Sequence, residues 1–222
     1  STGKPKGAGN THNAVTNLYN WYSQNFALSS RDKILIISAF GFDLTQKNLF
    51  SPLIVGGQII LPQSETYNQI EICEDVKQYR VTFLNCAPSA FYPLITSIQL
   101  INKLTPLKKV FLGGESINQT ELHEAFKRGL HCQIINTYGP TECADIATYY
   151  CLTQQDYTGQ SNIPIGLPIP NVKLHLLDSR QQHIPRGAVG ELYIAGDSVG
   201  AGYIGNKSLT AERFFKNPYG EG

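Results

Sequence analysis

Short apolar runs alternate with segments of helical periodicity up to residue 138, and this alternation most constrains the fold. Ile34–Ile37 is a continuous apolar run of the kind found in strands buried on both faces. Between such runs, apolar residues recur every three or four positions, as on the buried face of a helix. This alternation predicts βαβ units and an α/β fold, a mainly parallel sheet with flanking helices. The expected strands are 34–37, 59–61, 81–85, 109–112 and 133–138, and the expected helices are 13–26 (with Asn13 as N-cap), 44–55, 70–79, 89–100 and 120–128.

The pattern changes after about residue 160 to one typical of antiparallel β structure. Prolines recur through Ile163–Pro170, so this segment cannot be helical. Val172–Leu177 alternates as a half-buried strand does, and Gly190–Gly196 reads as a second strand. We therefore expect a partial α/β core over 1–160 and a partial, small, antiparallel β-barrel-like subdomain over 161–222.

Composition excludes several function classes. The 222 residues are 41% hydrophobic and 16% charged, with a formal net charge of +1, which is ordinary for a globular protein. Nucleic acids and anionic membranes select basic surfaces, so neither is expected as a partner. No apolar run reaches the roughly 18 to 20 residues of a membrane span. The five cysteines form no C-x-x-C pair, which predicts reduced, mostly buried thiols in a cytoplasmic protein.

Polar residues gather where the predicted strands end. Asp43, Asn85, the turn 113–115 (Gly-Gly-Glu) and Tyr138 follow or end four different strands. In parallel α/β sheets, ligands bind outside the carboxyl ends of the strands. The residues alone therefore predict one composite site at that edge of the sheet.

Residues 136–142 (Asn-Thr-Tyr-Gly-Pro-Thr-Glu) combine three kinds of chemistry in one turn. Tyr138 offers an aromatic face for a base, Thr141 a hydroxyl for a phosphate, and Glu142 a hard oxygen ligand suited to Mg²⁺. Taken singly, each residue would fit an ordinary strand and turn. Ser1–Gly7 has small residues and two lysines that would suit an anion, although solvated surface loops have similar sequences.

Four motifs that follow one another in the family's order, and the linker before the last of them, resemble the adenylation domain of nonribosomal peptide synthetases, within the adenylate-forming superfamily. Residues 1–7 resemble the end of its phosphate loop (S-T-G-x-P-K-G), and residues 136–142 match N-x-Y-G-P-T-E in full. Phe42-Asp43 resembles F-D-x-S, with Thr45 in place of serine. Residues 163–168 resemble the linker that precedes the last motif. Residues 190–204 resemble G-E-L-x-I-x-G-x-x-V-A-x-G-Y-L, with Gly200 in place of alanine.

The resemblance implies an enzyme that activates an amino acid with ATP and Mg²⁺, giving aminoacyl-AMP and pyrophosphate. The acyl group would pass to phosphopantetheine on a peptidyl carrier domain, with a condensation domain in the same polypeptide. We expect the chain to be an internal fragment of such a protein. The family's ribose-binding Asp and its C-terminal subdomain with the catalytic Lys would lie outside it, so we expect this fragment alone to be inactive.

The resemblance also implies residue roles. Thr141 and Glu142 would be catalytic, and Glu142 would bind the metal. The nucleotide would be held by Ser1, Thr2, Gly3, Lys4, Lys6, Gly113, Gly114, Glu115, Asn136, Tyr138, Gly139 and Thr141. The amino acid would be lined by Asp43, Leu44, Lys47, Asn85, Phe111, Gly113, Thr137, Gly139, Asp145 and Ile146.

Two questions stay open at this level. Asp43 would pair with the substrate ammonium, which favours an amino acid over a fatty acid, but it could instead be a helix N-cap. Lys47 could pair with Asp145, bind a polar substrate side chain, or point to solvent. The alternative functions are an acyl- or aryl-CoA ligase of the same superfamily and an inactive nucleotide-binding fragment.

Overall fold

The computed structural model describes residues 6–64, 66–158 and 162–220. These residues divide into two compact units. The large unit consists of 22–138 and 148–167, and the small unit consists of 6–21, 139–147 and 168–220.

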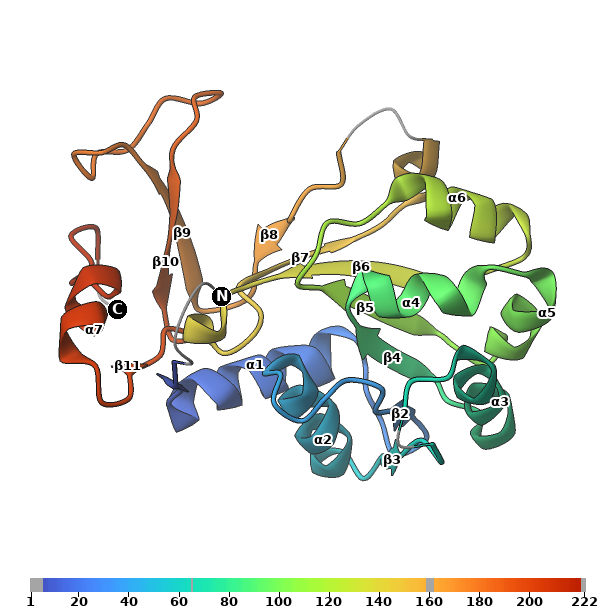
Figure 1. Ribbon diagram of the computed structural model, residues 1–222. Coiled ribbons are helices and arrows are strands. Elements are labelled where there is room, and N and C mark those ends of the chain that lie inside the picture. The colour runs from blue at the N-terminus through green and yellow to red at the C-terminus, as the bar shows by residue number, and fades with distance from the viewer. Residues whose placement is uncertain (1–5, 65, 159–161, 221–222) are drawn as a thin grey trace. The chain divides into compact units, whose positions relative to one another are not determined.

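The large unit is built on a seven-stranded sheet with the strand order β3-β2-β4-β5-β6-β7-β8. The pairs β2–β3, β2–β4, β4–β5 and β5–β6 are parallel, whereas β7 pairs antiparallel with β6. The mostly parallel α/β fold is therefore confirmed (Figure 1). The strands are β2 (Lys33–Leu35), β3 (Gln58–Ile60), β4 (Phe83–Cys86), β5 (Lys109–Gly113), β6 (Gln133–Tyr138), β7 (Thr148–Cys151) and β8 (Leu167–Pro168).

Four helices of the chain agree with the expected ranges to within one residue at each end. They are α1 (His12–Asn25), α2 (Leu44–Ile54), α3 (Gln69–Tyr79) and α6 (Gln119–Lys127). Shorter helical turns are α4 (Pro88–Phe91), η1 (Tyr92–Ile95), α5 (Ile98–Ile101), η2 (Asn102–Leu104) and η4 (Gln154–Thr158).

The single helix expected over 89–100 is wrong. The chain forms α4, the 3₁₀ turn η1 and then α5. Pro93 lies in η1 and has no N–H for an α-helical hydrogen bond. The Ser97 side chain then accepts a hydrogen bond from the Leu100 N–H and starts a new helix.

The N-cap expected at Asn13 is also wrong, because α1 begins one residue earlier, at His12. The Thr11 hydroxyl oxygen accepts a hydrogen bond from the Ala14 N–H at 3.1 Å. Threonine therefore supplies the side-chain oxygen that the first turn of the helix requires.

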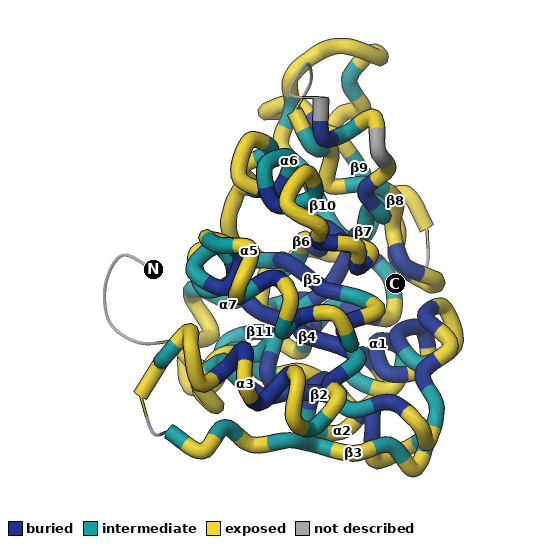
Figure 2. Tube along the Cα trace, turned by 90° about the vertical axis from the view of Figure 1, so that its right-hand side faces the viewer, coloured by how far each residue is buried: buried dark blue, intermediate teal, exposed yellow. Residues whose placement is uncertain are grey.

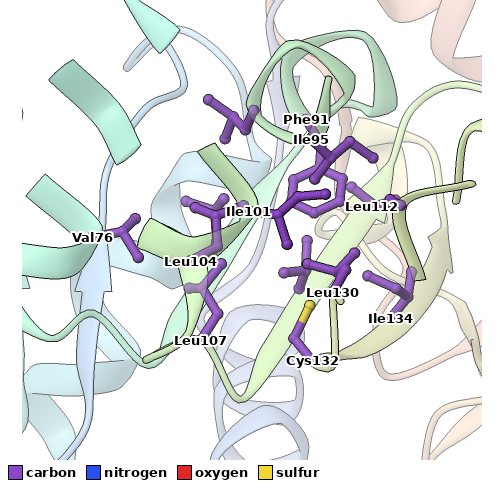
Figure 3. Close-up of a cluster of buried hydrophobic side chains, with 14 of the residues drawn as sticks. Val76, Phe91, Ile95, Ile101, Leu104, Leu107, Leu112, Leu130, Cys132 and Ile134 are labelled. Carbon is purple, nitrogen blue, oxygen red and sulfur yellow. The ribbon is translucent and has the colours of Figure 1, made fainter. Parts of the chain in front are cut away.

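The core of the large unit lies between the sheet and α3 to α6. Strands β4 and β5 are buried along almost their full length (Figure 2). Leu112 and Ile134 from the sheet join Phe91, Ile101 and Leu104 from the helical turns in one apolar cluster (Figure 3). This burial agrees with the apolar residues Phe83-Leu84 and Val110–Leu112 within β4 and β5.

The cysteines are free thiols, as predicted, and four of the five are buried. Cys73, Cys86 and Cys132 belong to the apolar cluster of the large unit. Burial raises the pKa of each of these thiols to about 12. They therefore act as small apolar side chains rather than nucleophiles.

The small unit contains two antiparallel strand pairs. β9 (Val172–Leu177) and β10 (Glu191–Gly196) form a hairpin in which Val172 lies opposite Gly196. β1 (Ala8–Gly9) pairs with β11 (Gly202–Tyr203), and α7 (Lys207–Arg213) follows. The antiparallel strands expected near 172–177 and 190–196 are thus present, whereas a barrel stays a prediction. Within the described ranges of both units, no helix combines the length and apolar character needed to cross a membrane.

Asp75 on α3 is a buried carboxylate with an incomplete set of partners. It is 4% exposed, and its Oδ2 has no hydrogen-bond partner among the described residues. Burial raises the pKa of this carboxyl and the charge of Glu71 raises it further, although the Gln63 backbone N–H donates to it. The native state then binds more protons than the unfolded chain above about pH 4. This group's contribution to stability therefore declines as pH rises.

We expect Asp75→Asn to increase the free energy of unfolding at pH 7.5 by about 1 kcal/mol, because it removes a buried charge. The difference should shrink as pH falls, since protonation of wild-type Asp75 removes the same buried charge. Urea unfolding at pH 7.5 and at successively lower pH values measures the difference. Glu121→Gln, an exposed acid on α6, should change little. A variant less stable than wild type at pH 7.5 would contradict this prediction.

Candidate functional site

Four of the predicted substrate residues lie on neighbouring strands of the large unit. In the register of the sheet, Asn85 of β4 is the partner of Phe111 of β5. Gly113 at the end of β5 is the partner of Thr137 in β6. The sheet therefore brings these four residues together near the carboxyl ends of parallel strands, where α/β proteins bind ligands.

A buried polar cluster lies between α2 and β4, centred on the Leu44 carbonyl oxygen. Lys47 Nζ donates to that oxygen at 3.3 Å, Asn48 Nδ2 at 3.1 Å and Asn85 Nδ2 at 3.4 Å. Asn85 Nδ2 also lies 3.2 Å from Asn48 Oδ1. Lys47 is 1% exposed, so the alternative in which its side chain points to solvent is wrong. The interior of the large unit beside Leu44 is therefore polar, although the three side chains of the cluster are buried.

Sequence reasoning missed Asn48. Asn48 is fully buried. Its side chain forms hydrogen bonds to two predicted substrate residues, the Leu44 carbonyl and the Asn85 amide. Its position four residues after Leu44 puts both on one helix face, which was the available signal. That signal could not distinguish a buried amide from a solvated one.

Asp43 lies at the N-terminus of α2 and is partly exposed. Its Oδ1 accepts a hydrogen bond from the Leu44 N–H at 2.7 Å, so the N-cap interpretation holds. In the described part of the chain, no hydrogen bond involves its second oxygen. The second carboxylate oxygen of Asp43 can therefore accept a hydrogen bond from a ligand.

Gly113 is packed against Thr137. The Thr137 hydroxyl donates to the Leu112 carbonyl at 3.2 Å, which fixes its rotamer. A Cβ at position 113 would lie 2.6 Å from Thr137 Oγ1, closer than van der Waals contact allows. Only glycine therefore fits at this strand end without moving a neighbour.

We expect Gly113→Ala to destabilise the protein by about 1–3 kcal/mol, because the added methyl group overpacks against Thr137. Thermal unfolding measures the loss. Gly41→Ala is the matched control, since no atom lies within 4 Å of a Cβ there. Equal unfolding temperatures for the two variants would contradict the packing argument.

Glu115 and Asn136 already have partners within the large unit. The Glu115 carboxylate accepts hydrogen bonds from the Ser89 N–H at 3.0 Å and the Ser89 hydroxyl at 2.8 Å. Asn136 is buried, and its Nδ2 donates to the Pro164 carbonyl at 2.8 Å. Tyr138 differs, because its side chain is 40% exposed at the end of β6. Its ring therefore has a face that a planar base could cover.

The last four residues of the 136–142 motif lie in the small unit. Thr141 and Glu142 lie in the 3₁₀ turn η3 (Thr141–Cys143). The Tyr203 hydroxyl donates a hydrogen bond to Glu142 Oε1. This bond to a carboxylate, together with burial, raises the pKa of Tyr203. Glu142 and Tyr203 line a cavity of 650 Å³ within the small unit, which Lys6 and Arg213 also line.

Two further predicted substrate residues follow η3. Asp145 has a left-handed backbone with φ of 78°. Its charge adds to burial in raising the pKa of Tyr19. Ile146 is buried, and its N–H donates to the Ala144 carbonyl at 3.1 Å.

The predicted residues are thus divided between the units. Asp43, Leu44, Lys47, Asn85, Phe111, Gly113, Gly114, Glu115, Asn136, Thr137 and Tyr138 belong to the large unit. Lys6, Gly139, Thr141, Glu142, Asp145 and Ile146 belong to the small unit. Ser1, Thr2, Gly3 and Lys4 lie outside the described residues.

The donor set fits a nucleotide-borne magnesium ion better than a metal held by protein alone. Within the described ranges, no group of three or more His, Cys, Asp or Glu residues could hold a metal ion. Mg²⁺ is commonly held by one or two carboxylates and by the substrate phosphates. Glu142 supplies one carboxylate in a cavity that Lys6 also lines, so the residues present fit that arrangement.

Sequence comparison matches residues 1–204 to the family described as AMP-binding enzyme. The chain is 35% identical over its full length to surfactin synthase subunit 2 of Bacillus subtilis (strain 168) and spans 6% of it. It is 37% identical, again over its full length, to tyrocidine synthase 3 of Brevibacillus parabrevis and spans 3% of it.

Solved structures agree with the match to the AMP-binding enzyme family. An AMPPNP-bound form of the nonribosomal peptide synthetase FmoA3 matches with a TM-score of 0.85 and 25% identity, over 98% of this chain and 24% of that one. The N-terminal subdomain of Klebsiella oxytoca NpsA with 3-hydroxybenzoyl-AMSN matches with a TM-score of 0.83 and 27% identity, over 99% of this chain and 55% of that one. The chain belongs to the AMP-binding enzyme family and is of the adenylation-domain type found in nonribosomal peptide synthetases.

Proposed function

We propose that the chain is part of an adenylation domain that activates an amino acid in its parent protein. A carboxylate oxygen of the amino acid attacks the α-phosphorus of ATP, and the bond from that phosphorus to the β-phosphate oxygen breaks. The products are aminoacyl-AMP and pyrophosphate. The strongest support is the family match over residues 1–204, combined with the four substrate residues on adjacent strand ends.

The proposal gives each group one task. The second oxygen of Asp43 accepts a hydrogen bond from the substrate ammonium, and Asn85, Phe111, Gly113 and Thr137 line the side-chain pocket. These contacts orient the carboxylate for in-line attack, which supplies much of the rate enhancement of such reactions. The buried cluster around Lys47 favours a substrate with a polar side chain.

The nucleotide-binding roles follow from the motif resemblance. Tyr138 stacks on the adenine, with Gly113, Gly114, Glu115, Asn136 and Gly139 around the base. Thr141 donates to the α-phosphate, Glu142 binds Mg²⁺, and Ser1, Thr2, Gly3, Lys4 and Lys6 hold the outer phosphates. When bound, Mg²⁺ neutralises phosphate charge that grows in the transition state.

We further propose that the parent protein is cytoplasmic and delivers the acyl group to phosphopantetheine on a carrier domain. A solved relative is an artificially fused adenylation–PCP di-domain from Klebsiella oxytoca, which supports this partner. A condensation domain in the same polypeptide follows from the kinship with peptide synthetases. The chain would supply a partial core over 1–160 and part of a β-barrel-like subdomain over 161–222, and the subdomain with the catalytic Lys would be contributed by the parent protein.

An aryl acid is the second candidate substrate, because the NpsA subdomain is solved with 3-hydroxybenzoyl-AMSN and 3-hydroxyanthranilyl-AMSN. ATP–pyrophosphate exchange by the parent protein, with a panel of amino acids, aryl acids and fatty acids, decides between them. We expect exchange with an amino acid. Exchange with aryl or fatty acids alone would contradict the proposal, and thioester release with free CoA would favour a CoA ligase.

A further inference from the structure

The hydrogen bond from Tyr203 to Glu142 joins two segments that are 61 residues apart in the small unit. Tyr203 donates to Oε1, whereas Oε2 of Glu142 accepts no hydrogen bond in the described part of the chain. We propose that Tyr203 is a positioning residue, which holds one carboxylate oxygen of Glu142 so that the other is presented to the metal of a metal–nucleotide complex. This inference rests on the proposed function, in which Glu142 binds Mg²⁺.

The phenol of Tyr203 is itself held in place. The Tyr203 N–H donates to Thr210 Oγ1 at 2.9 Å. Its ring packs edge-on against Phe214, with 5.6 Å between ring centroids and an angle of 86° between the planes. On the other side, β11 pairs with β1, with Tyr203 opposite Ala8. A donor that is fixed by backbone and packing can impose an orientation on its acceptor.

The backbone of Glu142 is held by the same region of the small unit. Its carbonyl accepts a hydrogen bond from the Gly200 N–H at 2.8 Å, and the Thr141 carbonyl accepts one from Asn10 Nδ2 at 3.0 Å. A Cβ at Gly200 would lie 2.7 Å from the Gly9 carbonyl oxygen and 3.0 Å from that of Glu142. Glycine at this position, where the family pattern has alanine, therefore lets the Tyr203 segment approach Glu142 closely.

A phenol suits this task chemically. It donates one hydrogen bond and stays neutral, so the carboxylate keeps its charge for a cation. An arginine in its place could pair with both oxygens and block the metal. Lys6 Nζ lies 5.2 Å from the centroid of the Tyr203 ring. The Tyr203 side chain thus lies beside a residue predicted to bind phosphate, through its ring, and bonds to a residue predicted to bind metal, through its hydroxyl.

The test uses the parent adenylation domain with Tyr203→Phe, which removes the donor and keeps the ring. The probe is Mn²⁺ with ATP in the absence of amino acid, so that binding is measured by electron paramagnetic resonance without turnover. We expect the metal to bind about 10-fold more weakly, as for other groups that orient a metal ligand. Tyr193→Phe is the matched control, because this hydroxyl lines the same cavity but bonds only weakly to Glu191, at 3.4 Å.

A double-mutant cycle separates positioning from general destabilisation. Glu142→Gln should weaken Mn²⁺ binding, and adding Tyr203→Phe to it should weaken binding no further. If Tyr203→Phe binds Mn²⁺ with ATP as tightly as the wild-type protein does, the positioning role alone is overturned. It is also overturned if the losses of Mn²⁺ affinity caused by the two substitutions are fully additive. A wild-type protein that binds no Mn²⁺ with ATP would overturn the proposed function, and the positioning role with it.

Discussion

Replacing Glu142 by glutamine in the parent adenylation domain is expected to slow ATP–pyrophosphate exchange by about 10²–10³-fold. Glutamine keeps the shape of the side chain but removes the charge that we propose holds Mg²⁺. The loss of one preorganised electrostatic group in an active site typically has this effect. Initial exchange rates at saturating amino acid, measured across a range of Mg²⁺ concentrations, give the size of the loss.

Glu191→Gln is the control for this variant. Glu191 also lines the cavity of the small unit and is exposed, but it belongs to β10 and has no predicted role in metal binding. We expect its exchange rate to stay close to that of wild type. If Glu142→Gln exchanged as fast as Glu191→Gln, Glu142 would not be the metal ligand.

The second large effect is expected at Asp43. Asn and Asp cap helices equally well, so Asp43→Asn should preserve the contact to the Leu44 N–H and the stability of α2. The same change removes the charge that we propose pairs with the substrate ammonium. Removing one partner of such a pair costs about 2–5 kcal/mol, so kcat/KM for the amino acid should fall by about 30-fold or more.

This variant separates the two interpretations of Asp43 and the two candidate substrates. An N-cap role alone predicts an unchanged exchange rate, as does activation of an aryl acid, which has no ammonium to bind. Asp178→Asn is the control, because Asp178 Oδ1 also accepts backbone hydrogen bonds, from the Arg180 and Gln182 N–H groups at 2.8 and 2.9 Å. Thermal unfolding should give similar temperatures for both variants.

Much of the architecture could be predicted from local patterns. The strand expected at 133–138 is β6 residue for residue, and the strand expected at 172–177 is β9. Both depend on apolar periodicity and on nearby turn residues, which a short window contains. The failure at 89–100 had a local cause as well, because Pro93 and the Ser97 cap outweigh the apolar spacing in that segment.

Pairing between distant segments was not predictable in the same way. β7 runs antiparallel to β6 and lies between β6 and β8 in the sheet, and no strand was expected at 148–151. The two-residue strands β1 and β11 are recognisable only as partners of each other. Such short segments have no periodicity of their own, so their conformation depends on hydrogen bonds to distant residues.

The sequence by itself determined the alternation of strands and helices through β6, the residue types at the strand ends and the family, because periodicity and motif spacing are local properties. Tertiary structure decided which polar side chains share a site. It buried Lys47 and Asn48 around the Leu44 carbonyl and brought the Tyr203 hydroxyl to Glu142. Burial and hydrogen-bond partners depend on the packing of segments far apart in the chain, which no local pattern contains.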